Sequence, residues 1–266
     1  MQLNSVTLVY FSPTRTTKRV LEEIAAGLDC DTVTHVDLTS PAVNGQALSI
    51  DRASLALIGA PVYGGRLPAV AVQRLRQVQG NGALAVPVVL YGNRLFEDAL
   101  LELCDLAAKQ SFRPIAGGAF IGEHSYSTKS LPLSPGRPDE QDLEQACDFG
   151  RQIREKLLAL PPTGILPMLA IPGDYPYREW RKRTDITPVT QTDICTRCGA
   201  CVEVCPTSAI APDDVSQTDP AACLLCCACV RACPVGARTL DDPDIQQTRE
   251  WLASSCAERK EPEVWL

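Results

Sequence analysis

Eight cysteines in the last third of the chain repeat one spacing twice, and this repeat limits the possible folds more than any other feature. The first array runs from Cys195 to Cys205-Pro206 and the second from Cys223 to Cys233-Pro234, each with the spacing C-x2-C-x2-C-x3-C-P. The chain has 13 cysteines, and most of them are clustered rather than spread along it. Clustered thiols in a reducing compartment indicate metal ligands, not a disulfide framework.

The spacing within each array suits an iron–sulfur cube. Three thiolates at two-residue steps on a tight loop can wrap one face of a cube, whereas the fourth cysteine, after a longer spacer, ligates the other cluster. We therefore predict two [4Fe–4S] clusters in a small α+β ferredoxin-like domain. The predicted ligand sets are Cys195, Cys198, Cys201 and Cys233 for one cluster, and Cys223, Cys226, Cys229 and Cys205 for the other.

Structural zinc is the alternative for these cysteines. Zinc ribbons use two separated C-x2-C pairs for tetrahedral closure, whereas here three cysteines at two-residue steps precede Cys-Pro in each array. The whole pattern resembles bacterial two-cluster ferredoxins. Cys227, next to Cys226, interrupts the second array either as a thiol that tunes the cluster or as a small buried residue. We favour burial, because free cysteine packs like a small apolar side chain.

Residues 1–160 alternate between short apolar runs and segments with helical periodicity, which predicts βαβ units and a parallel sheet. Strands are expected at 6–10, 32–36, 55–59, 83–90 and 115–120, and helices at 16–28, 69–78, 97–109 and 140–160. Five strands separated by helices indicate a flavodoxin-like, doubly wound α/β fold.

A proline-rich stretch at 161–190 separates this region from the cysteine arrays. It contains a basic patch at Arg181-Lys182-Arg183 and several apolar residues that are expected to pack: Ile165, Leu166, Met168, Leu169, Tyr175, Tyr177 and Trp180. These side chains predict an ordered linker. After the arrays, a short helix is expected at about 244–257, and the final Val264-Trp265-Leu266 is expected to dock on a neighbouring surface.

The loop after the first strand, FSPTRTT at 11–17, precedes a helix and is rich in hydroxyl groups. Hydroxyls and backbone N–H groups at a helix N-terminus bind anions. The loop lacks the glycines of a dinucleotide fingerprint and the Gly-Lys of a P-loop, and an ordinary capping cluster is the alternative. It resembles the FMN phosphate loop of flavodoxins, with Arg15 in place of a glycine. The predicted phosphate-binding residues are Ser12, Thr14, Arg15, Thr16 and Thr17.

Later loops follow the predicted third, fourth and fifth strands. In an open parallel sheet, ligands bind beyond the carboxyl ends of the strands. Glycines there let the backbone approach a flat ring, and Tyr63 can stack on it; the alternative for Tyr63 is a core position. His124 is either a flavin or phosphate contact or a structural hydrogen-bonding residue. The predicted flavin-binding residues are Pro61, Val62, Tyr63, Gly64, Gly65, Gly92, Asn93, Arg94 and His124.

These loops, IGEHSY at 121–126, PGDYP at 172–176 and the two arrays together resemble the EFR1 family of flavodoxin–ferredoxin fusions over nearly the whole chain. The resemblance implies FMN in the first domain and two [4Fe–4S] clusters in the second, and it does not identify partners. The expected organisation is a flavin domain at 1–160, a linker at 161–190, a cluster domain at 191–240 and a C-terminal helix and tail at 241–266.

A net charge of −7 argues against binding to a nucleic-acid backbone and is compatible with docking to basic patches on redox partner proteins. The N-terminus has no basic region before its short apolar run, and no stretch is long enough to span a bilayer, so a cytoplasmic location is expected. We predict an electron carrier. The alternatives are an FMN-dependent reductase fed by its own clusters and a redox sensor.

Overall fold

The computed structural model describes residues 5–160, 169–180 and 183–266. The predicted packing of Ile165, Leu166 and Met168 and the basic pair Arg181-Lys182 lie outside these ranges.

The first part of the chain forms a parallel sheet that confirms the predicted α/β fold. Its main strands are β1 (Ser5–Tyr10), β2 (Thr32–Asp37), β4 (Leu55–Pro61), β6 (Leu84–Tyr91) and β8 (Gly117–Ile121). They pair in parallel in the spatial order β2-β1-β4-β6-β8. Numbered along the chain, this is the order 2-1-3-4-5 of flavodoxin-like sheets, and it places ligands beyond the carboxyl ends of the strands.

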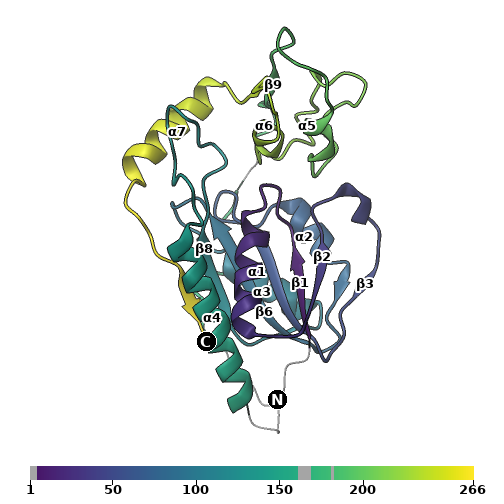
Figure 1. Cartoon of the computed structure of the whole chain (residues 1–266), viewed down its shortest axis with the longest axis vertical. Helices are drawn as coiled ribbons and strands as arrows, with labels where there is room; N and C mark the ends of the chain where they lie inside the picture. Colours follow the sequence, from purple (N-terminus) through teal and green to yellow (C-terminus); the bar gives the residue numbers. More distant parts are fainter. Residues whose placement is uncertain (1–4, 161–168, 181–182) are drawn as a thin grey trace.

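Helices cover both faces of the sheet (Figure 1): α1 (Thr16–Leu28) and α4 (Glu140–Ala159) lie on one face, and α2 (Ala69–Leu75) and α3 (Ala99–Lys109) on the other. The helices α1 and α4 approach so closely that side chains are excluded between them. A Cβ on Gly27 would lie 1.9 Å from the carbonyl oxygen of Cys147, and one on Gly150 would lie 2.1 Å from that of Ile24. Glycine is therefore required at both positions.

Several short elements have no counterpart in the sequence prediction. They are η1 (Pro41–Val43), β3 (Leu48–Ser49), β5 (Val78–Gln79) and β7 (Arg113–Pro114). Strands of two residues carry no hydrophobic periodicity that could reveal them. The predicted helix at 69–78 is shorter than expected, because the chain leaves α2 after Leu75 and forms β5 at Val78.

The two cysteine arrays lie beyond the carboxyl edge of the sheet (Figure 1). Each array contributes one helical turn, α5 (Ala200–Glu203) or α6 (Ala228–Arg231), and the hairpin-like pair β9 (Val189–Thr190) and β10 (Arg238–Thr239) joins the ends of this region. The helix α7 (Pro243–Ser255) follows, and its N-terminus is capped by the Asp242 carboxylate, which accepts hydrogen bonds from the backbone N–H groups of Asp244 and Ile245.

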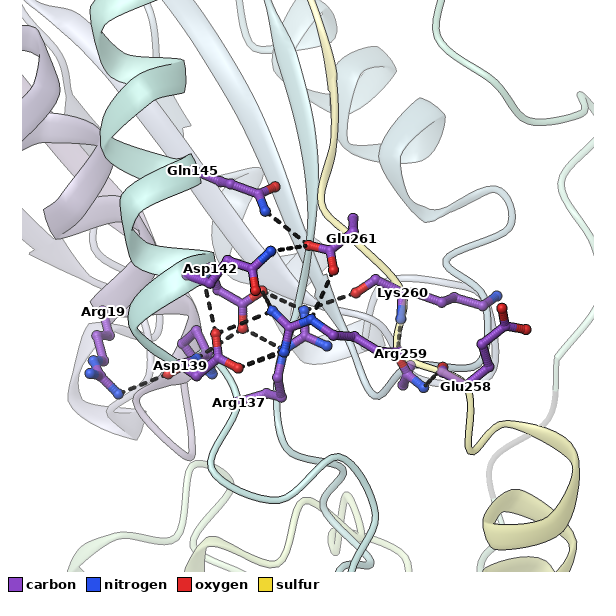
Figure 2. A network of polar contacts seen from close by, with 12 residues as sticks. Arg19, Arg137, Asp139, Asp142, Gln145, Glu258, Arg259, Lys260 and Glu261 are labelled. Atoms are coloured by element: carbon purple, nitrogen blue, oxygen red, sulfur yellow. Dashed lines mark hydrogen bonds and ion pairs between the residues drawn. The ribbon is translucent and has the colours of Figure 1, made fainter.

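The end of the chain returns to the sheet. The strand β11 (Glu263–Trp265) pairs antiparallel with β8, as expected from the predicted docking of the last residues. The segment before it crosses the start of α4 through a polar network (Figure 2), in which Arg259 donates to the Asp139 carboxylate at 2.6 Å. Arg137 pairs with the fully buried Asp142 and donates to the carbonyl oxygen of Lys260 at 2.9 Å.

None of the helices in the described ranges combines the length and the apolar character that a membrane span requires.

Candidate functional site

A cavity of about 420 Å³ opens at the carboxyl edge of the sheet, and we call it the edge cavity. The loops after β1, β4, β6 and β8 line one side, as the strand order predicts. Of the predicted flavin-binding residues, those that line it are Thr14, Thr16, Pro61, Val62, Tyr63, Gly64, Gly92, Arg94 and His124. Those that do not are Ser12, Arg15, Thr17, Gly65 and Asn93.

The loop before α1, for which the sequence predicts an anion site, leads directly into the N-terminus of that helix. Arg15 is its N-cap residue and has φ 64°, a left-handed conformation that glycine adopts most easily. Arginine thus keeps the loop conformation expected of the glycine it replaces, and its side chain is exposed. The buried Ser12 organises the loop, because its Oγ accepts a hydrogen bond from the Lys18 N–H at 3.1 Å.

Two glycines allow the tight turn after β4. Gly64 and Gly65 have φ of 61° and 84°, and the backbone groups of Tyr63 and Arg66 hydrogen-bond to each other across the turn. A Cβ on Gly64 would lie 2.0 Å from Nε1 of Trp180, and one on Gly65 would lie 1.6 Å from Oε2 of Glu97. The space beside each glycine is therefore taken by a protein side chain, and Gly64 lets the linker residue Trp180 reach the edge cavity.

The residues of the loop after β6 contact two different parts of the molecule. Gly92 lines the edge cavity, and a Cβ there would lie 2.3 Å from Cδ2 of His124. Asn93 instead binds the tail: its Nδ2 donates to the carbonyl oxygens of Cys256 and Glu258 at 2.7 and 2.8 Å. The sequence placed Asn93 beside the flavin because it could not show that the tail returns to this loop.

His124 is a neutral imidazole at the edge cavity. Its Nδ1 accepts a hydrogen bond from the Tyr126 N–H at 3.0 Å, so the ring proton is on Nε2. Burial and, to a smaller extent, the nearby guanidinium groups of Arg231, Arg94 and Arg249 together lower the pKa of His124 to about 4. The side chain is therefore a hydrogen-bond donor rather than a cation at neutral pH.

The opposite wall of the edge cavity comes from segments that the sequence did not connect with it. These residues are Trp180 and Arg183 from the linker, Leu224 and Leu225 from the second array, and Ile245, Thr248, Trp251 and Leu252 from α7. Leu224 and Leu225 separate the ligand candidates Cys223 and Cys226, so the second array is part of the cavity wall.

Burial raises the pKa of Tyr63 well above its usual value, and the adjacent thiols of Cys226 and Cys227 raise it further.

The cysteines gather around two small cavities with the predicted grouping. One is lined by Cys195, Cys198, Cys201 and Cys233, which we call the outer set. The other is lined by Cys205, Cys223, Cys226 and Cys229, the inner set, and also by the extra Cys227. Each set has three cysteines from one array and the fourth from the other array. In the described ranges, no three histidine, cysteine or carboxylate side chains converge as they would on one metal ion. Four thiols around one cavity instead fit the donor set of a four-iron cluster.

The two sets differ in exposure. Cys198 of the outer set is exposed and its companions are half-buried, whereas Cys223, Cys226 and Cys229 of the inner set are buried. The extra Cys227 is buried in an apolar cluster with Leu225 and Leu240, which agrees with the packing interpretation. It has φ 57° at the N-cap of α6, where the first array has Gly199 with φ 78°.

Arginines attach the inner set to the sheet. The buried Arg74 of α2 donates from Nη2 to the carbonyl oxygen of Pro206 at 2.7 Å, directly after Cys205. From the other side, Arg231 donates to the carbonyl oxygen of His124 at 3.1 Å. The buried Arg249 of α7 donates to the carbonyl oxygen of Tyr126 at 2.9 Å. These contacts hold the second array beside the edge cavity.

Comparison with known proteins gives one sequence family. Residues 188–211 match the model of the 4Fe-4S binding domain. This segment contains the first array and Cys205 of the inner set. No curated protein matches the chain as a whole.

Solved structures resemble the sheet region. A flavodoxin from the domain Archaea is 14% identical, with 58% of this chain and 99% of that chain covered and a TM-score of 0.38. A Fusobacterium nucleatum flavodoxin bound to flavin mononucleotide is 16% identical, with 57% and 98% covered and a TM-score of 0.38. Rubredoxin oxygen:oxidoreductase from Desulfovibrio gigas is 13% identical, with 59% of this chain but only 37% of that protein covered and a TM-score of 0.38.

At these TM-scores the fold assignment rests on the strand order of the sheet. That order and the matched cysteine segment together show what the chain combines: it is a fusion of a flavodoxin-like domain with a region of the 4Fe-4S binding type.

Proposed function

We propose that the chain is an electron-transfer protein that binds FMN in the edge cavity and one [4Fe–4S] cluster in each cysteine set. When bound, FMN exchanges two electrons singly and each cluster exchanges one. The observation that carries the proposal is that Leu224 and Leu225, between two inner-set cysteines, line the same cavity as the loops after the sheet strands. The proposal includes membership of the EFR1 family and the domain boundaries 1–160, 161–190, 191–240 and 241–266.

The edge cavity offers the groups that a flavin phosphate and ring need. Thr14 and Thr16, before and at the start of α1, offer hydroxyls beside the N–H groups of a helix N-terminus. Tyr63 and the neutral His124 offer an aromatic face and a ring N–H donor to a flat ligand. Leu224 lines both the edge cavity and the inner-set cavity, so the two cavities share a wall.

One chain that holds both kinds of site removes the need for a diffusional encounter between them. Arg74 bonds to Pro206, next to Cys205, and Arg231 of the second array bonds to His124 at the edge cavity, so direct contacts join the inner set to the sheet domain. The outer set is the surface end of this arrangement, because Cys198 is exposed. We therefore propose that redox partner proteins exchange electrons at the outer set.

The alternative function, a small-molecule reductase, has less support. The edge cavity has a volume of about 420 Å³. It lies toward the lower end of the roughly 300–1,000 Å³ that is typical of ligand pockets. It suits one flavin-sized ligand and leaves little room for a second molecule against the ring. Trp180 and Trp251 also line the cavity.

The proposal can be tested on anaerobically prepared protein. It should contain one FMN and, from two four-iron cubes, about eight iron and about eight sulfide per chain. After stopped-flow mixing with a limiting amount of dithionite, electrons should redistribute between clusters and flavin at a rate independent of protein concentration. In the matched variant Cys205→Ala, which lacks an inner-set ligand, redistribution should become slow and concentration-dependent.

Two outcomes would contradict the proposal. Stoichiometric zinc without labile sulfide would exclude the clusters. Unchanged redistribution in the Cys205→Ala variant, after loss of its inner cluster, would exclude the inner set as the site next to the flavin. A substrate-dependent oxidation of the flavin at high turnover would favour the reductase.

A further inference from the structure

A buried arginine lies between the two cysteine sets. Arg238 in β10 is only 2% exposed, and it lines both the outer-set cavity and the inner-set cavity. One cation is therefore shared by two sites that the cysteine repeat would make equivalent.

The repeat shows that an arginine is unusual at this position. Arg238 follows Cys233 by five residues, and Ile210 follows Cys205 by the same five. Ile210 is also 2% exposed, but it lines only the inner-set cavity and is apolar. The position thus accepts an apolar side chain in one half of the repeat, so the fold does not itself require a charge there.

Among the residues that the structure describes, no carboxylate pairs with Arg238. Nη1 donates to Oγ1 of Thr190 at 2.7 Å and to the carbonyl oxygen of Val215 at 2.9 Å, and Nη2 donates to Oγ1 of Thr218. These acceptors are neutral, and within the described ranges Nε is buried without any hydrogen-bond partner. A buried cation is costly unless it is paired with an anion.

The missing anion is supplied by the cysteine sets when they hold their clusters. Four thiolates around each cluster give it a net negative charge, and one-electron reduction adds one more negative charge without making or breaking a covalent bond. A buried cation nearby favours the more negative state, and the charge and hydrogen bonds around the sulfurs are known determinants of cluster potential.

We propose that Arg238 is a shared counter-charge for both clusters and that it raises the reduction potential of each. The inference rests on the proposed presence of two clusters. The reduction potentials of the outer and inner clusters then depend on one shared residue. The cysteine spacing alone does not predict this role.

The test is an anaerobic redox titration of both clusters, followed by electron paramagnetic resonance, with iron and sulfide measured on every sample. Arg238→Met keeps a long side chain without charge and resembles the apolar partner in the repeat. It should disfavour reduction by about tenfold or more, which is about 59 mV for a one-electron couple. Arg238→Lys keeps the charge and should retain most of the wild-type potential.

The control removes the same charge from the surface. Arg197 is exposed and directly precedes Cys198, so solvent and salt screen it. Arg197→Met should shift the equilibrium less than Arg238→Met does, and mainly for one cluster. If Arg238→Met loses iron, Arg238→Gln replaces it as the uncharged variant.

The outcomes separate this inference from the function on which it rests. Wild-type protein without iron and sulfide would overturn the proposed function itself. Intact clusters with potentials changed less than about twofold in equilibrium constant (roughly 18 mV) would overturn the role of Arg238 alone. Loss of iron from both uncharged variants would also overturn it, because the arginine would then be needed for assembly rather than for potential.

Discussion

The two cysteine arrays have the same spacing but lie in different surroundings. The outer set reaches the surface at Cys198, whereas three cysteines of the inner set are buried, and Leu224 and Leu225 between two of them line the edge cavity. The residues between and after the ligands differ correspondingly: Gly199 is replaced by Cys227, and Ile210 by Arg238. Identical ligand spacing therefore gives two sites of different accessibility, of which one lies beside the edge cavity and the other faces solvent.

The largest expected effect comes from removing the one cysteine of a set that the other array contributes. Cys205→Ala should remove the inner cluster, and Cys233→Ala the outer one, so iron should fall from about eight to about four per chain in each variant. The cluster that remains in Cys205→Ala should react quickly with ferricyanide, because it is the exposed one. The cluster that remains in Cys233→Ala should react slowly.

The opposite assignment of reactivities would show that each fourth cysteine ligates the cluster of its own array. Cys205 would then belong to the exposed outer set and Cys233 to the buried inner set. Loss of both clusters in both variants would show that the two sites assemble only together.

A smaller effect tests the contact that only the second array makes with His124. The unfolded state protonates His124 near its ordinary pKa of 6.5, whereas in the folded state the pKa is about 4. The unfolded state therefore binds more protons between these values, and folding stability decreases as the pH falls through this range. At pH 5.5 the loss relative to pH 7.5 should be about 1 kcal/mol.

Thermal unfolding midpoints at pH 7.5 and 5.5 measure this loss. His124→Gln should remove that part of the pH dependence. Arg231→Met in the second array should reduce it, because Arg231 is one of the charges that lower the pKa, whereas Arg197→Met in the first array should not. Equal effects of the two arginine variants would show that the two arrays do not differ in their influence on the pKa of His124.

The smallest effect concerns the matched residues Gly199 and Cys227. Both have left-handed backbone conformations, and a Cβ on Gly199 would meet no atom within 4 Å. Gly199→Ala should therefore cost only the backbone strain, about 1 kcal/mol. Cys227→Gly should relieve similar strain, lose some packing and leave both clusters assembled. Thermal midpoints and iron content measure both changes, and loss of a cluster from Cys227→Gly would show that this thiol is more than a packing residue.

Sequence reasoning reached the sheet because its strands and helices rest on local periodicity. The helix at 16–28 was predicted to the residue, since Val20, Leu21, Ile24 and Leu28 form one buried face. The far wall of the edge cavity was not predicted. Trp180, Leu225 and Leu252 come from three distant segments, and only the folded chain brings them together. Asn93 was misplaced for the same reason, because its partners lie more than 160 positions later.

The pairing of β11 with β8 has a consequence for the order of events during synthesis. The strand partners Glu263 and Ala119 are separated by the linker, both arrays and α7. Contacts between such distant parts of a chain close late in folding, and domains emerge from the ribosome in order from the N-terminus. The edge cavity thus acquires its α7 wall, and β8 its β11 partner, only after all eight cysteines of the two arrays have been translated.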